Sequence, residues 1–452
     1  MHMRPDLVEC YGEERLPRYT SYPTTPHFSK SVGPSTYAAW LTTVPSHSTA
    51  SLYLHVPFCR AMCWYCGCHT SVAKQDDIIE SYTSAMREEI DLVSRQLCHR
   101  LRVRHVHFGG GTPTILKSAA FIQLVTLLRR SFDIGREAEI AVEIDPRTLD
   151  KAMIAALKLA GVNRASIGVQ SFDPVVQRAI NRVQSFAQTA AATAALRNIG
   201  VRGINFDLIY GLPHQTVASC LDTVLRSAEM QPERFSIFGY AHVPGFKSHQ
   251  RRIEEAALPK GAERYRQFEA MAAALCDMGY RRIGLDHFCR PEDTMSVAQS
   301  RGTLRRNFQG YTTDTSDVLL GFGASAIGRL GQGYVQNEVG TRAYAQALAS
   351  GSLATVRGHT LTNDDRMRGE IIERIMCDFG ADIGHICERY RQMPDRFLAS
   401  SARLKDLIAS GVATLRGSNL RVVGDARFLV RSVAATFDHH LDASGALHSR
   451  AV

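Results

Sequence analysis

Short apolar segments alternate with helical patterns over the first half of the chain. The segments with strand character are residues 51–56, 103–108, 139–144, 164–169, 204–209 and 235–238. Helical spacing of apolar residues separates them over 78–97, 121–132, 149–160, 186–199 and 218–230. Strands that alternate with helices predict a parallel sheet in an α/β fold. Six such repeats, instead of eight, predict a partial (β/α)6, TIM-like barrel that is open on one side.

Polar and glycine residues gather where these strands end. They are Tyr53 and His55, the loop 109–112, Glu143 and Asp145, Gln170, Asp207 and Tyr210, and Tyr240 and His242. Parallel α/β barrels carry their chemistry at the carboxyl ends of the strands. The pattern therefore predicts an active site at this rim.

The sequence predicts three parts along the chain. These are an irregular N-terminal segment or flap (1–50), the barrel with an extension (51–330), and a small, mainly helical domain (331–452). In the extension, 283–288 has strand character, and small residues in 319–327 allow close backbone approach. In the last part, residues 362–365 cap a helix that runs to Phe379, and a Gly-Ser-Asn turn joins a hairpin over 413–423. Helices with a hairpin resemble a winged-helix-like domain.

Four cysteines fall within ten residues after the first strand, at Cys59, Cys63, Cys66 and Cys68. If this loop were wound like a helix, the first three would share one face and Cys68 would point away. A [4Fe–4S] cluster held by three cysteines keeps one iron open to another ligand. Zinc is the alternative, although structural zinc sites usually join two separate pairs of cysteines.

The spacing C-x3-C-x2-C, with the aromatic Tyr65 before the third cysteine, resembles the signature of radical S-adenosylmethionine (SAM) enzymes. The resemblance implies the same partial barrel, a cluster held by Cys59, Cys63 and Cys66, and SAM chelated to the open iron. In that family, one electron from the reduced cluster cleaves SAM to methionine and a 5′-deoxyadenosyl radical. The radical then abstracts an unactivated hydrogen atom from the substrate.

The loop Gly109-Gly-Gly-Thr-Pro113 follows the second strand of the predicted sheet. Its glycines free the backbone to approach a ligand and to present amides and carbonyls directly. By resemblance, it is the segment that holds the ammonium group of SAM's methionine part, and Gly110, Gly111 and Thr112 are assigned to this contact.

Composition bounds the cellular setting. The chain of 452 residues carries a formal charge of +9 from dispersed basic residues, and its first residues lack the apolar core expected of a signal peptide. No apolar run reaches about twenty residues, so no membrane span is expected. Seven scattered cysteines outside the loop favour reduced thiols. We therefore expect a cytoplasmic protein without a nucleic-acid partner. Its positive charge is explained by a solvated surface, and an acidic small substrate would fit the excess equally well.

A closer resemblance covers nearly the whole chain. Six segments are similar to those of the oxygen-independent coproporphyrinogen III oxidases, at residues 18–23, 55–59, 66–68, 109–114, 207–213 and 307–313. This family decarboxylates two propionate side chains of coproporphyrinogen III to vinyl groups, giving protoporphyrinogen IX in anaerobic haem biosynthesis. The resemblance implies that activity, a low-potential electron donor of the flavodoxin or ferredoxin kind, and a monomer.

That family binds two SAM molecules. By resemblance, the first, on the cluster, would contact Tyr53, Gly110, Glu143 and Ile327. The second would contact Tyr65, Gly111, Thr112, Gln170, Arg182, Asp207 and Ala241. No side chain is expected to act as a catalytic acid or base, and His287, beside Asp286, is expected to be a buried structural residue.

The substrate carries four carboxylates, and arginine pairs with carboxylates through two hydrogen bonds. The candidates for substrate binding are Arg18, Arg290, Arg305, Arg306, Gln309 and Tyr311.

Three other functions fit parts of the sequence. A haem chaperone on the same fold would keep the cysteine and glycine loops but lack segments 18–23 and 307–313, which are present here. A radical SAM enzyme that acts on tRNA would need concentrated positive charge, which the sequence lacks. A zinc-stabilised regulatory protein with a winged helix would show no iron–sulfur absorption.

Overall fold

The structure, a computed structural model, describes residues 7, 10–12, 14–399 and 401–441. These residues form two compact units, each assembled from separate stretches of the chain. The first, here called the sheet unit, contains 29–258 and 314–360. The second, here called the helical unit, has its described residues within 7–28, 259–313 and 361–441. The expected sequential division at residues 50 and 330 stays a prediction, and its outermost residues, 1–6 and 442–452, lie outside the described part.

The sheet unit is built on a sheet whose strands follow the order β16-β15-β14-β13-β1-β4-β5-β6-β7-β8. Each neighbouring pair from β13 to β8 is parallel, and β14, β15 and β16 extend the sheet with antiparallel pairs. The predicted parallel sheet and partial barrel are therefore confirmed. The strands are β1 (Thr49–Val56), β4 (Arg102–Gly110), β5 (Asp133–Ile144), β6 (Arg164–Gln170), β7 (Gly203–Tyr210), β8 (Arg234–Gly239), β13 (Val318–Phe322), β14 (Ile327–Leu330), β15 (Gly333–Asn337) and β16 (Thr355–Thr360).

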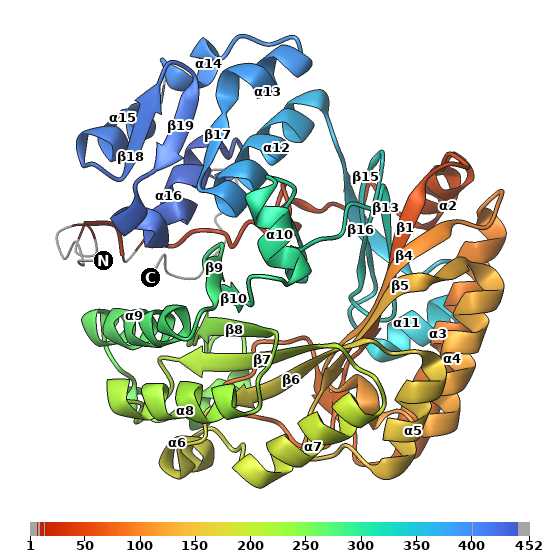
Figure 1. Ribbon diagram of the computed structural model, residues 1–452. Coiled ribbons are helices and arrows are strands. Elements are labelled where there is room, and N and C mark those ends of the chain that lie inside the picture. Colours follow the sequence, from red (N-terminus) through yellow and green to blue (C-terminus); the bar gives the residue numbers. More distant parts are fainter. Residues whose placement is uncertain (1–6, 8–9, 13, 400, 442–452) are drawn as a thin grey trace. The chain divides into compact units, whose positions relative to one another are not determined.

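Helices cover the outer face of this sheet (Figure 1). They begin and end where the local sequence provides caps: Asp150 accepts a hydrogen bond from Met153 N–H at the start of α5, and Gly161 ends that helix in the left-handed conformation. The helices are α2 (Pro34–Thr42), α3 (Asp76–Gln96), α4 (Ser118–Ser131), α5 (Lys151–Ala160), α6 (Pro174–Ala179), α7 (Phe186–Asn198), α8 (Val217–Glu229) and α11 (Thr341–Ala349). The five helices predicted between the strands correspond to α3, α4, α5, α7 and α8, with boundaries shifted by at most three residues.

The alternation of side chains along β1 separates an apolar face from a polar one. Leu52 and Leu54 are almost fully buried. Tyr53 points to the opposite side and stacks on His107, its partner in the register of β4, with ring centroids 5.8 Å apart. The polar face lines the barrel and carries the functional side chains described below.

Residues 319–327 contribute a strand that the sequence analysis had treated only as a segment of close approach. β13 pairs with β1, and Tyr53 lies opposite Gly321. A Cβ atom on Gly321 would lie 2.6 Å from the carbonyl oxygen of Ile327, so the expected close backbone approach is confirmed. The pairing joins residues more than 250 positions apart, which local sequence patterns do not reveal.

The helical unit contains a small sheet of order β17-β19-β18 packed with helices. The predicted helix after Thr362 and the hairpin over 413–423 are both present, as α12 with a capping box and as β18 and β19. The elements are α9 (Gly261–Asp277), β9 (Arg281–Ile283), β10 (His287–Cys289), α10 (Thr294–Ser300), β11 (Arg305–Asn307), β12 (Gly310–Thr312), α12 (Asn363–Asp378), β17 (Gly380–Asp382), α13 (Ile383–Arg389), α14 (Asp395–Leu398), α15 (Ala402–Ala409), β18 (Ala413–Arg416), β19 (Asn419–Val422) and α16 (Val430–Ala434).

The single strand expected over 283–288 is wrong. β9 and β10 form a hairpin, and the chain turns at Gly284, which has a φ of +56°. The ring of Tyr311 occupies the space where a Cβ atom of Gly284 would lie, so glycine is required there for two reasons.

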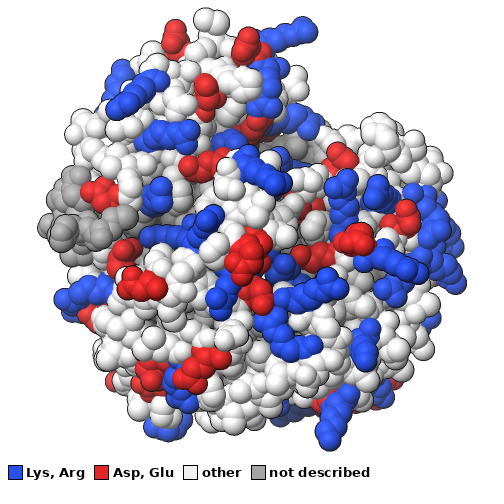
Figure 2. Space-filling model, viewed as in Figure 1, with Lys and Arg blue, Asp and Glu red and all other residues white. Residues whose placement is uncertain are grey.

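No helix within the described residues is both long and apolar enough to cross a membrane. Basic and acidic side chains are interspersed on the face drawn in Figure 2, as the dispersed charges in the sequence predict.

Candidate iron–sulfur and SAM site

The four clustered cysteines lie on the loop that follows β1. Short strands β2 (Phe58–Cys59) and β3 (Ser71–Val72) pair at its base, and the chain between them contains one hydrogen-bonded turn, from Cys63 to Cys66, but no helix. A helical face therefore does not explain the separation of Cys68, and that part of the sequence argument is wrong. The selection of Cys59, Cys63 and Cys66 as the cluster ligands stays a prediction.

Segments after β6 and β8 hold the cysteine loop by its backbone. Asn181 donates to the carbonyl of Met62 at 2.8 Å, and Trp64 N–H donates to the carbonyl of Ile180 at 2.9 Å. Three side chains after β8 bind loop carbonyls in the same way: Gln250 to Tyr65, His249 to Cys66 and Lys247 to Cys68, at 3.1, 2.8 and 2.8 Å. These contacts tie the backbone of the loop to distant parts of the barrel, and the side chain of His69 adds a further contact, to the carbonyl of Val339 at 3.0 Å.

The thiol of Cys59 lies between two hydroxyl groups. Its Sγ atom is 3.4 Å from Oγ1 of both Thr70 and Thr112. Burial raises the pKa of Cys59, while hydrogen bonds from Thr112 and Thr70 lower it. These hydroxyls are suited to stabilise a thiolate ligand, which is the form of cysteine that binds iron.

Two arginines surround the thiol of Cys63. Nη2 of Arg147 lies 3.6 Å from its Sγ atom, and Nη1 of Arg182 lies 3.7 Å from it. Asp145 pairs with both guanidinium groups, at 2.6 and 3.3 Å. Burial raises the pKa of Asp145, but the hydrogen bond from Arg147 and the two positive charges bring it below its usual value. The thiol of Cys63 is therefore surrounded by charged groups that are hydrogen-bonded to one another.

The thiol groups of Cys66 and Cys68 are hydrogen-bonded to each other. The hydrogen bond with Cys68 lowers the pKa of Cys66 to about 7, assisted by the charges of Lys247 and Arg182, whereas burial acts in the opposite direction. All the cysteines of the chain carry free thiols. The hydrogen bond with Cys66 and burial raise the pKa of Cys68, so Cys66 is the thiol of this pair that more readily loses a proton to a metal.

The residues expected around the first SAM lie on adjacent strands. Glu143, near the end of β5, accepts a hydrogen bond from Gly110 N–H at 3.2 Å and another at 3.2 Å from Nε2 of His107. Burial raises the pKa of Glu143, but the His107 hydrogen bond and charge lower it below its usual value. Tyr53 lies on β1 between them and β13, and Ile327 begins β14. The structure thus brings these four predicted residues onto one continuous region of the sheet.

The glycine loop touches the base of the cysteine loop. Gly111 and Thr112 donate backbone hydrogen bonds to the carbonyls of Val56 and Phe58, both at 2.8 Å. A Cβ atom on Gly111 would lie 2.5 Å from Oγ1 of Thr70 and 2.6 Å from the carbonyl oxygen of Phe58. Glycine is therefore required for this contact within the protein, whereas the predicted approach of the glycine loop to SAM stays a prediction.

The residues expected around the second SAM are arranged along β6 to β8. Gln250 donates to the carbonyls of both Tyr65 and Ala241, at 3.1 and 3.2 Å, and so joins these two predicted positions. Asp207 accepts hydrogen bonds from Ser166 and Asn205, each at 2.8 Å, inside the barrel.

Gln170 ends β6 in the left-handed conformation, with a φ of +67°. Its Oε1 atom is buried and accepts no hydrogen bond from any residue in the described part of the chain. Nε of the buried Arg182 is likewise unpaired among these residues, although Nη2 of Arg182 donates to Gly168. Strained backbone and unpaired buried atoms are typical of a site that a polar ligand completes.

The six candidates for substrate binding all belong to the helical unit. Arg306 stacks over Tyr311 at 4.4 Å and donates from Nη2 to the carbonyl of Arg18 at 3.2 Å. Its Nε and Nη1 atoms are buried and lack hydrogen-bond partners among the described residues. Arg305 instead pairs with Glu373 at 3.1 Å.

The other candidates are engaged differently. The hydroxyl of Tyr311 donates to the carbonyl of Met376 and accepts from Leu285 N–H, at 2.8 and 3.2 Å. Arg290 stacks on Tyr280 at 4.9 Å, and Gln309 is exposed. The structure therefore joins Arg18, Arg306 and Tyr311, and it uses the Tyr311 hydroxyl within the core.

A hydrogen-bonded pair lies beside this group. His287 Nδ1 is 2.7 Å from Oδ1 of Asp286, and the His287 ring lies at 5.5 Å from that of Tyr311. Burial raises the pKa of Asp286, but the His287 hydrogen bond and the charges of Arg306 and Arg18 hold it below its usual value. His287 is buried, as expected from the sequence.

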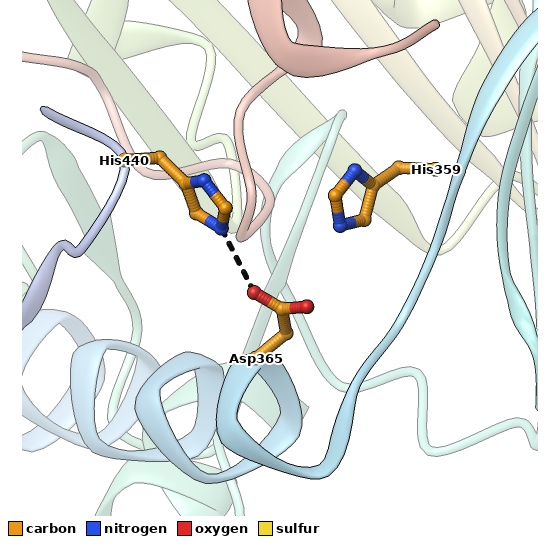
Figure 3. A group of neighbouring side chains, drawn as sticks. All are labelled: His359, Asp365 and His440. Carbon is orange, nitrogen blue, oxygen red and sulfur yellow. Dashed lines mark hydrogen bonds and ion pairs between the residues drawn. The ribbon is translucent and has the colours of Figure 1, made fainter. Parts of the chain in front are cut away.

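In the same unit, Asp365 of α12 forms a 2.9 Å hydrogen bond with His440 (Figure 3).

Comparison with known proteins identifies the family. The model of the Radical SAM superfamily matches residues 53–226. An oxygen-independent coproporphyrinogen III oxidase of Bradyrhizobium diazoefficiens is 62% identical over 450 residues, which are 100% of each chain. This chain belongs to the oxygen-independent coproporphyrinogen III oxidases.

Further oxygen-independent coproporphyrinogen III oxidases are similar along nearly their whole length. That of Cereibacter sphaeroides is 41% identical over 433 residues, covering 96% of each chain. The solved structure of the Escherichia coli coproporphyrinogen III oxidase, described as a radical SAM enzyme, superposes with a TM-score of 0.91 and 36% identity. It covers 98% of this chain and 100% of that one. The resemblance stated from the sequence is therefore confirmed, together with the fold.

The sequence analysis missed several residues that contribute to the candidate iron–sulfur and SAM site of this oxidase. Arg147 follows the rim residue Asp145 by two positions, and that proximity was a usable signal. His107 shares the period-two pattern that brings Gly109 to the polar face of β4. Lys247, which binds the cysteine loop, lies in an irregular segment after β8, and no local pattern points to it.

Proposed function

We propose that this chain catalyses the oxygen-independent oxidative decarboxylation of coproporphyrinogen III to protoporphyrinogen IX, converting two propionate side chains to vinyl groups. The observation that carries the proposal is the 62% identity with a protein of that named activity over the full length of both chains. The identity includes the parts that a general radical SAM core does not need, which argues against a haem chaperone.

The cysteine loop and the barrel rim fit the cofactors that the radical SAM family implies. Cys59, Cys63 and Cys66 would hold a [4Fe–4S] cluster, with one iron left for SAM. When bound, the reduced cluster and SAM supply a radical able to remove a hydrogen atom that no acid–base group can remove. The unpaired Oε1 of Gln170 supports a second SAM at β6, as the family resemblance implies.

In this proposal, the side chains of the protein bind and orient the cluster and SAM. The ionised Glu143, held by His107, suits the ammonium group of the first SAM. The thiol of Cys59 lies beside the hydroxyl of Thr112 and that of Cys63 beside the guanidinium of Arg147, and both groups are suited to stabilise a thiolate ligand. The proposed SAM contacts thus follow from side chains that the fold has already fixed.

The substrate is an anion with several carboxylates, and Arg306 is the best placed of the candidate residues. It offers two unpaired, buried N–H groups, and the positive charge of Arg18 acts together with that of Arg306 on the nearby Asp286. Arg305 is partly neutralised by Glu373 and is expected to contribute less. Arg290 and Gln309 remain predicted contacts.

The cell biology follows from the chemistry. A low-potential cluster with free thiols requires a reducing compartment, so we infer a cytoplasmic enzyme. It would receive electrons from a flavodoxin- or ferredoxin-like donor and act as a monomer.

The test is an anaerobic reaction of the chain reconstituted with iron and sulfide. SAM, a strong reductant and coproporphyrinogen III are added, and 5′-deoxyadenosine and tetrapyrroles are measured together. The expected result is formation of both 5′-deoxyadenosine and protoporphyrinogen IX. Deoxyadenosine without a decarboxylated tetrapyrrole would keep the radical SAM class and reject the substrate; haem binding without SAM cleavage would indicate a chaperone.

A further inference from the structure

A buried carboxylate lies behind the sheet, away from the cysteine loop. Glu89 is in the middle of α3, and only 1% of its surface is exposed. Its neighbour Glu88 is exposed to solvent. A buried carboxylate costs free energy unless it is hydrogen-bonded, so its partners indicate its role.

Three donors from three different elements converge on Glu89. Oε2 accepts from Gly323 N–H at 2.7 Å and from the hydroxyl of Tyr344 at 2.6 Å. Oε1 accepts from Nδ2 of Asn337 at 2.5 Å. Asn337 also donates to the carbonyl of Gly323 at 3.0 Å. Both backbone polar groups of Gly323, its N–H and its C=O, are therefore hydrogen-bonded. The carboxylate is therefore the anchor of the turn between β13 and β14.

The next residue of the turn is held from the same helix. Tyr82, two turns before Glu89 on α3, accepts a hydrogen bond from Ala324 N–H at 2.8 Å. Its own hydroxyl donates to the carbonyl of His55 at 2.7 Å. Tyr82 thus connects the turn to the end of β1, where the cysteine loop begins.

The turn has no freedom to move toward β1. Gly323 has a φ of +99°, and a Cβ atom there would lie 2.5 Å from the carbonyl oxygen of His55 and 2.6 Å from the Tyr82 hydroxyl. Ser325 follows with a φ of +65°. Glycine adopts positive φ readily, whereas a left-handed serine persists only where surrounding contacts hold it.

This turn leads directly into a proposed SAM contact. The turn ends at Ile327, the first residue of β14, and the Ile327 carbonyl lies against Gly321, which is opposite Tyr53 in the register of β1 and β13. His55 hydrogen-bonds to the hydroxyl of Tyr53 through Nδ1 at 2.9 Å. Displacement of the turn would therefore alter the positions of both Tyr53 and Ile327.

We propose that Glu89 is a positioning residue for SAM, because it fixes the turn 323–327 from the far side of the sheet. The inference rests on the proposed function only in assigning Ile327 and Tyr53 to the SAM pocket. Glu89 touches neither cofactor nor substrate.

The test compares Glu89→Gln with the matched control Glu88→Gln. Glutamine keeps the shape of the side chain but turns an N–H group toward a donor, either Asn337 or Gly323. Hydrogen exchange of the turn amides is measured by mass spectrometry, and the SAM dissociation constant is measured by the change that SAM causes in the electron paramagnetic resonance of the reduced cluster. Glu89→Gln is expected to accelerate exchange over 323–327 and to weaken SAM binding about tenfold. Iron content and the rate at saturating SAM should stay near those of the wild type.

A second variant keeps the inference testable if Glu89→Gln folds poorly. Tyr344→Phe removes one donor and leaves the ring in the core, so a smaller change in the same direction is expected. Wild-type exchange in both variants, or a loosened turn with unchanged SAM affinity, would overturn the inference. Failure of the proposed function looks different: the wild type itself would show no SAM effect on its cluster, while the exchange experiment would still report whether Glu89 holds the turn.

Discussion

Arg147 places a guanidinium nitrogen 3.6 Å from the sulfur of Cys63. The same guanidinium is fixed by two hydrogen bonds to Asp145, so its distance from the thiol is set by the backbone at the end of β5. A cation beside a ligand sulfur stabilises the more negative, reduced state of a cluster.

Arg147→Gln is therefore expected to shift the midpoint potential of the reconstituted cluster to a more negative value. Formation of 5′-deoxyadenosine with a fixed reductant should slow by about tenfold or more. The potential is measured by redox titration with electron paramagnetic resonance detection. Arg136→Gln, at an exposed position of β5, is the control and should leave the potential unchanged. An unaltered potential in Arg147→Gln would show that this arginine has only a structural role.

The ligand set is tested by single cysteine substitutions. Cys63→Ala should lose the cluster, whereas Cys68→Ala should retain about four iron atoms per chain after anaerobic reconstitution, since three thiolates suffice. The cluster content of each variant is measured by iron and sulfide analysis and by the visible absorption spectrum. Loss of the cluster in Cys68→Ala, with a folded chain, would contradict three-thiol ligation.

Gly111→Ala tests the close approach of the two loops. The new Cβ atom would meet the backbone oxygen of Phe58, which cannot rotate away, so the loop must shift. We expect a loss of about 1–3 kcal/mol in the free energy of unfolding, together with weaker iron retention. Gly135→Ala, where no atom lies within 4 Å of the added carbon, should be nearly neutral in the same denaturant titration.

Arg306→Ala is expected to weaken binding of coproporphyrinogen III by roughly ten- to a hundredfold, since one charged hydrogen bond contributes roughly 1.5–3 kcal/mol. Substrate affinity is measured anaerobically, with the cluster content verified to be unchanged. Arg301→Ala, at an exposed position nearby in the sequence, is the control. Equal affinities in the two variants would remove Arg306 from the substrate site.

Glu89 also predicts a pH dependence of stability. Burial raises its pKa to about 7 in the folded chain, against 4.5 ordinarily, although the hydrogen bonds from Tyr344, Gly323 and Asn337 oppose that rise. The folded state then holds a proton that the unfolded state has released between these two values, so stability falls as pH rises through this window. Tyr82 and Tyr344 face the carboxylate, and burial raises the pKa of each, so neither ionises there.

The measurement is the difference in unfolding free energy between wild type and Glu89→Gln, from pH 5 to pH 8. Glutamine does not titrate, so the variant should gain relative to the wild type as pH rises, by at most about 3 kcal/mol. A constant difference over this range would mean that the Glu89 carboxyl does not change protonation between the folded and unfolded states in this window.

The sequence by itself determined the periodic part of the fold and the chemistry of the cysteine loop. Strands such as 103–108 and helices such as 186–199 are encoded by local spacing, because apolar side chains must face the core at period 2 or 3.6. The cysteine spacing and the glycine loop are equally local, so the family resemblance was visible without coordinates.

Only the tertiary structure decided which distant residues support that loop. Arg147 beside Cys63, Glu89 beneath Gly323, and β13 beside β1 are contacts between positions far apart in the chain. The strand expected over 283–288 failed for the same reason, since a turn at Gly284 depends on where Tyr311 packs. Such contacts form because folding buries and pairs polar groups in three dimensions, and no repeating pattern in the sequence records the partner.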